Sequence, residues 1–125
     1  MENKERLKNA RNILLKLHKS LIDRERDAFE SVNGPLNSSQ FLNVLIEDPD
    51  FAWLRKFSTL IVEIDEMFDA KDGIPSEMID ANLAKVRDLV EMKDEDEYFR
   101  AKYSAALQED LDAAGLQAEI KAALD

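Results

Sequence analysis

The sequence predicts an all-α protein, an antiparallel bundle of four main helices with one or two short helices. The chain has 125 residues, of which only 3 are Gly and 3 are Pro, so few residues interrupt a helix. Hydrophobic residues make up 45% and charged residues 35%, a composition typical of amphipathic helices with one solvent-exposed face. Since this length is typical of one domain with its own core, we expect residues 1–125 to form a single domain.

The first helix is predicted from Lys4 to Val32. Gly34 and Pro35 end it, since Gly permits a left-handed cap and Pro cannot continue the hydrogen-bond ladder. Apolar side chains recur in this segment at intervals of three, four and seven residues, which places them on one stripe. The members of the stripe are Leu7, Ala10, Leu14, Leu17, Leu21 and Ala28.

A short second helix is predicted from Ser38 to Glu47. Asn37 and Gln40 stand at the spacing of a capping box at its start. Its buried side is predicted to comprise Phe41, Leu42, Leu45 and Ile46.

The third helix is predicted from Pro49 to Ala70, with Asp48 as its N-cap and Gly73 closing it. Its apolar positions alternate at three and four residues, as helices packed side by side require. They are Leu54, Phe57, Ile61, Ile64 and Phe68.

Two further helices and a helical tail complete the bundle. The fourth helix is predicted from Ser76, its N-cap, to Met92. The fifth opens with Asp94 and Glu97 in capping-box spacing, turns Leu111 inward and runs to Ala114. Gly115 is expected to end it. The tail, residues 116–124, forms a short helix that docks either on the bundle or on a partner.

Composition excludes several classes of function. The formal net charge is −10, whereas nucleic-acid binders generally have a basic surface, so no nucleic-acid partner is expected. No apolar run reaches membrane-spanning length, and the charged N-terminus does not resemble a signal peptide. The chain has no cysteine, which excludes disulfides and thiol catalysis. A cytoplasmic protein with no membrane contact is the expectation.

His18, the only histidine, is the one candidate for acid–base chemistry. Together with Glu25, two turns along the same helix face, it defines a possible polar site. The alternative is that His18 is an ordinary side chain at the edge of the core and has no functional role. No catalytic residue, metal ligand or cofactor is predicted, because the Glu-x-x-His pairs of di-metal bundles are absent. The loop after Asp69 also fails as a calcium site, since Lys71 occupies a ligand position.

A second apolar line follows the flank of the third helix. It comprises Trp53, Leu60 and Met67 and could join Leu116 and Ile120 of the tail in an exposed interface. Residues at this spacing more often belong to the core, because bundles need apolar residues on several helix faces. The leading functional hypothesis is a non-enzymatic protein-interaction or regulatory module, with a homodimer as one form of it. The alternatives are a ligand-binding or enzymatic bundle with a polar pocket near His18, and an acidic mimic of nucleic acid.

Residues 17–66 resemble a group of small bacterial helical proteins with no assigned activity. The resemblance is carried by residues 17–23, by Glu30 with residues 34–35, and by residues 48–55 and 61–66. It implies a bacterial cytosolic helical protein and transfers no functional residue.

Overall fold

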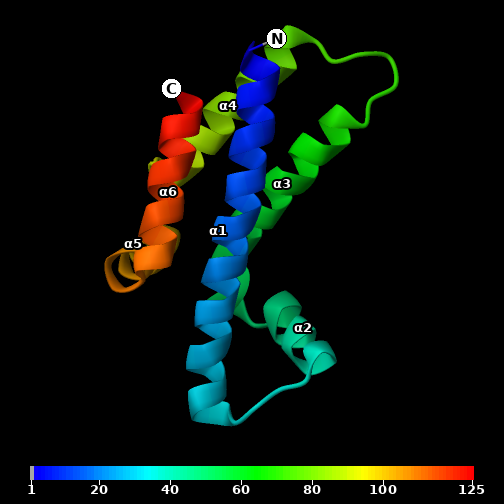
Figure 1. Cartoon of the computed structure of the whole chain (residues 1–125). Coiled ribbons are helices and arrows are strands. Elements are labelled where there is room, and N and C mark those ends of the chain that lie inside the picture. The colour runs from blue at the N-terminus through cyan, green and yellow to red at the C-terminus, as the bar shows by residue number, and fades with distance from the viewer. Residues whose placement is uncertain (1) are drawn as a thin grey trace.

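The computed structural model of the chain describes residues 2–125, and this part is all-α, with helices packed against each other and no strand. The predicted fold class is therefore confirmed. Figure 1 shows the long α1 running the length of the molecule, with α4, α5 and α6 on one side and α2 set apart near its far end. The elements in chain order are α1 (Glu2–Asn33), α2 (Ser38–Glu47), the 3-10 helix η1 (Pro49–Leu54), α3 (Arg55–Phe68), α4 (Ser76–Val90), α5 (Glu97–Glu109) and α6 (Leu111–Leu124).

α1 supplies the spine of the core, and its predicted stripe is buried over most of its length. It packs most extensively on α6 and also on α3 and α4. Gly34 ends it with φ 87°, in the left-handed region that favours glycine, and its N–H bonds the Glu30 carbonyl at 2.8 Å. Ala28 is exposed, contrary to the prediction, because α1 extends beyond the end of α5 and α6 here (Figure 1). The buried members are Leu7, Ala10, Leu14, Leu17 and Leu21.

The predicted third helix divides into two elements. The Asp48 carboxylate caps η1 by accepting a hydrogen bond from the Asp50 N–H at 2.9 Å. The residues that follow Asp48 form a 3-10 helix, which is wound more tightly than an α-helix. α3 then begins at Arg55 and ends at Phe68, five residues before Gly73. Gly73 does adopt a left-handed φ of 88°, but in the α3–α4 loop and not at the helix cap.

The predicted starts of α4 and α5 are displaced by one or two residues. Pro75 is the N-cap of α4, with Ser76 as its first helical residue. Asp96, not Asp94, caps α5 by accepting the Phe99 N–H at 3.1 Å. α4 ends at Val90, two residues before Met92, because Met92 takes a left-handed φ of 56°.

The segment beyond α5 differs most from the prediction. Asp110 ends α5 and caps α6 through the Asp112 N–H, so Gly115 lies inside α6 and is not a terminator. Leu111, predicted to face inward, is 89% exposed because it opens α6 on the outer side.

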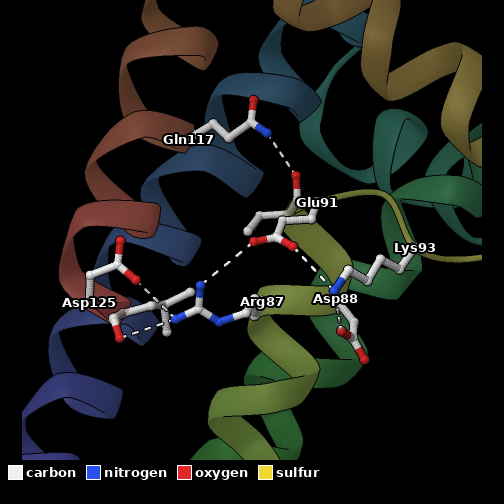
Figure 2. Close-up of polar contacts among 8 residues, drawn as sticks. Arg87, Asp88, Glu91, Lys93, Gln117 and Asp125 are labelled. Carbon is white, nitrogen blue, oxygen red and sulfur yellow. Dashed lines mark hydrogen bonds and ion pairs between the residues drawn. The ribbon is translucent and has the colours of Figure 1, made fainter.

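The tail docks within the same chain. Gln117 Nε2 donates to the Val90 carbonyl at 2.7 Å, and Arg87 of α4 donates to the Leu124 carbonyl at 3.3 Å and to Asp125 at 3.2 Å (Figure 2). These polar contacts flank a fully buried Ile120. α6 therefore completes the core around α1.

Candidate functional site

The predicted interface along the third-helix flank is buried inside this chain. Trp53, Leu60 and Met67 are 2%, 6% and 5% exposed, and Ile120 is fully buried. Leu116 packs partly buried against the same core. The prediction of an exposed patch is wrong for these residues, because α4 packs on α3, α5 packs on η1, and α6 packs on α1.

Four aromatic rings fill the centre of that core. Phe57 lies 5.3 Å from Tyr103, 5.9 Å from Phe99 and 6.3 Å from Trp53, measured between ring centroids. The contacts with Tyr103 and Trp53 are edge-to-face, a geometry that adds to the stabilisation from burial. The Trp53 Nε1 and Tyr103 hydroxyl are buried without a hydrogen-bond partner. Burial raises the pKa of Tyr103, so its hydroxyl stays protonated and the cluster serves packing.

His18 and Glu25 occupy different surroundings, so the structure does not bring them together as one polar site. The His18 ring stacks on Phe57 with centroids 6.3 Å apart. Burial lowers the pKa of His18, which favours its neutral form. The Glu25 carboxylate pairs instead with Lys102 of α5, Nζ to Oε1, at 3.2 Å.

A groove of about 480 Å³ lies beside His18 where α1, α2, η1 and α3 meet. Its walls are mainly apolar, unlike the polar pocket predicted here. Arg55 contributes a charge, but its guanidinium donates to the carbonyls of Leu45 and Ile46 at the end of α2. The groove is lined by His18, Ile22, Leu45, Ile46, Phe51, Leu54, Arg55 and Ser58.

The seam between α1 and α3 continues this groove. Arg11 forms two 2.8 Å bonds to Asp65 at one end of the seam, and His18 meets Phe57 at the other, which makes the two helices antiparallel. Leu15 and Val62 fall between these two contacts in helical register. They are 43% and 52% exposed, so each helix of the seam carries a large apolar side chain at the surface.

α2 carries the exposed rim of the groove. Only Phe41 of α2 is buried, whereas Leu42 and Ile46, predicted to be buried, are 55% and 59% exposed. The only charged residue among its ten is Glu47. We define the α2 face as its exposed, uncharged side, Ser38, Ser39, Leu42 and Ile46.

A larger cavity, about 740 Å³, opens between α3 and α4, but its lysines are already paired. Lys85 lies 3.1 Å from Glu63, and Lys56 lies 2.8 Å from Asp94. The Lys56 ammonium lowers the pKa of Asp94 through a side-chain hydrogen bond. The charges of this cavity therefore neutralise each other locally and do not present a site for an ion.

Two other features, a metal-binding cluster and a membrane-spanning helix, are absent from residues 2–125. No cluster of three or more His, Asp or Glu side chains is arranged to hold a metal ion within this part of the chain. In the same residues, every helix is too short or too polar to cross a membrane.

Of the residues that form the groove and the α2 face, only His18 was predicted as a site residue. The sequence did carry one signal, the single charge in residues 38–47 of a chain that is 35% charged. Comparison of the chain with protein-family models, curated proteins and solved structures found no match, so its function has to be argued from this geometry.

Proposed function

We propose that the protein is a non-enzymatic protein-binding module whose contact surface is the α2 face together with the adjoining groove. The observation that carries the proposal is the exposure of Leu42 and Ile46, 55% and 59%, on a helix with a single charged residue. Depletion of charge with retention of large apolar side chains is the composition of interface cores.

The groove adds to the α2 face a concave surface for an inserted side chain. Leu15 of α1 and Val62 of α3 are two further exposed apolar side chains. Contiguous apolar surface marks binding sites in soluble proteins, whereas single exposed apolar residues do not. Ile46 belongs both to the α2 face and to the lining of the groove, so the two form one surface that favours docking of another polypeptide.

A second candidate function is the binding of a small apolar ligand in the same groove. Its volume of about 480 Å³ falls in the range of ligand pockets, and its lining is mostly apolar. Native mass spectrometry of the protein purified from its own cells would detect such a ligand as an adduct lost on denaturation. Finding only the bare chain mass would count against this candidate.

In-cell crosslinking tests the protein-binding function. A photo-crosslinking amino acid at Leu42 is expected to yield one dominant protein adduct, because the side chain points away from the fold. The matched control is Met78 of α4, which is 47% exposed and lies outside the α2 face. Equal adducts at both positions, or none at Leu42, would contradict the proposal.

His18 is expected to make stability fall on acidification. Its pKa is lowered in the folded state, so between that pKa and the ordinary histidine value of 6.5 the unfolded chain binds more protons than the folded chain. The contribution of His18 to the free energy of unfolding is fully present above this pH window. It decreases as the pH falls through the window, by at most about 1.4 kcal/mol per pH unit for one proton. His18→Gln should remove this slope.

Urea unfolding of wild type and of His18→Gln from about pH 7.5 to pH 5 measures how the free energy of unfolding of each protein depends on pH. Since many carboxylates also titrate towards the acid end, the informative quantity is the difference between wild type and variant. Parallel curves for the two proteins would show that His18 titrates as freely in the folded state as in the unfolded chain.

A further inference from the structure

We infer that the α2 face is covered by a second copy of this chain, with the two α2 helices packed antiparallel about a twofold axis at Leu42. This inference rests on the proposed function and names the partner. In Figure 1 α2 stands apart from α4, α5 and α6, so a second molecule reaches it without meeting those helices.

Charge favours pairing through this face. Each chain carries a net charge of −10, so two copies repel each other wherever their acidic surfaces meet. Glu47 is the only charged residue of α2 and stands at its C-terminal end. The antiparallel arrangement brings that end beside the positive N-terminal end of the other α2, which is the favourable placement for a carboxylate.

The α2 face is also complementary to itself in shape. Leu42 lies midway between Ser38 and Ile46, four residues from each. Rotation about an axis at Leu42 therefore sets the large Ile46 of one copy over the small Ser38 and Ser39 of the other. Small side chains opposite large ones let helices approach closely and interdigitate. A twofold contact uses the same patch on both copies, as this pattern requires.

The groove and the α1–α3 seam give the contact its remaining area. A stable interface buries about 800 Å² per partner, more than a helix of ten residues offers on one side. Ile22 lines the same groove as Ile46 of the α2 face, and Leu15 of α1 and Val62 of α3 are exposed. We therefore place the edge of the interface on α1 and α3.

Light scattering over a concentration series tests the pairing. Wild type is expected to reach twice the mass of one chain, and Leu42→Glu should weaken the dimer by about 30-fold or more, because it buries two unpaired carboxylates at the axis. Met78→Glu adds the same charge at another exposed position and should leave the dimer intact. A single-chain mass at every concentration, or equal loss in both variants, would overturn the inference.

A cysteine crosslink tests the geometry independently of folding effects. The natural chain has no cysteine, so Leu42→Cys introduces one thiol per molecule. Helices in contact at this position bring the two Cα atoms within the range of a disulfide, about 4.4–6.8 Å. Mild oxidation is expected to give a covalent dimer with Leu42→Cys and not with Met78→Cys. Equal oxidation of the two variants would exclude the antiparallel pairing.

The outcomes separate this inference from the proposed function. If the purified chain is a monomer while the crosslinker at Leu42 captures a different protein in cells, the α2 face binds proteins but the second copy is the wrong partner. If Leu42 captures no protein and the purified chain is a monomer, both are refuted.

Discussion

Replacing Phe57 with alanine is expected to lower the free energy of unfolding by about 3–5 kcal/mol. The Phe57 side chain is fully buried and contacts Trp53, Phe99 and Tyr103 as well as the His18 ring. Its removal leaves a cavity bounded by rings that cannot collapse into it. Because whole domains are stable by only about 5–15 kcal/mol, the variant should be close to unfolding.

Urea titration followed by circular dichroism measures this loss. Glu66→Ala on the same helix is the control, since Glu66 is exposed and its truncation should change stability by less than about 0.5 kcal/mol. A Phe57→Ala variant as stable as the control would mean that α5 does not pack on α3 through this ring.

Replacing Ile120 with aspartate is expected to cost about 4 kcal/mol or more, the range reached when an unpaired charge is placed in a core. Ile120 is fully buried on α6, the helix that packs most extensively on α1. A carboxylate there either stays desolvated or forces α6 off the core.

Ala122→Asp adds the same charge at an exposed position of α6 and should be tolerated. Thermal unfolding of both variants measures the difference. Equal and small losses of stability in the two variants would show that α6 does not pack on α1 through Ile120.

Capping and helix-ending residues in the sequence were sufficient to predict the end of α1 and the start of α2. α1 ends at Gly34 as predicted, because few other residues tolerate a left-handed φ there. The capping box of Asn37 and Gln40 is present in full, with reciprocal bonds of 2.8 and 3.0 Å. Such boundaries depend on residues close in sequence and can therefore be derived from it.

The boundary between α5 and α6 could not be derived in the same way. Asp110 caps α6, but neighbouring acids such as Asp112 offer the same chemistry, so the residue type alone does not select it. Gly115 is tolerated inside α6 because tertiary packing overrides its weak helix propensity.

The candidate site was predicted only in part for a related reason. His18 was identified from its rarity, but its contact with Phe57 depends on the antiparallel register of α1 and α3. The apolar side of α2 is visible in the sequence as four residues. Only the position of α2 in the fold determines that Phe41 is covered and that Leu42 and Ile46 are not.

The central claim is that the α2 face is covered by a second copy of this chain. Hydrogen–deuterium exchange of the purified chain over a concentration series tests it most directly. We expect exchange in residues 38–47 to slow as concentration rises, together with residues 15–22 and 58–62, while α4 is unchanged. Exchange in α2 that is fast and independent of concentration would contradict the claim.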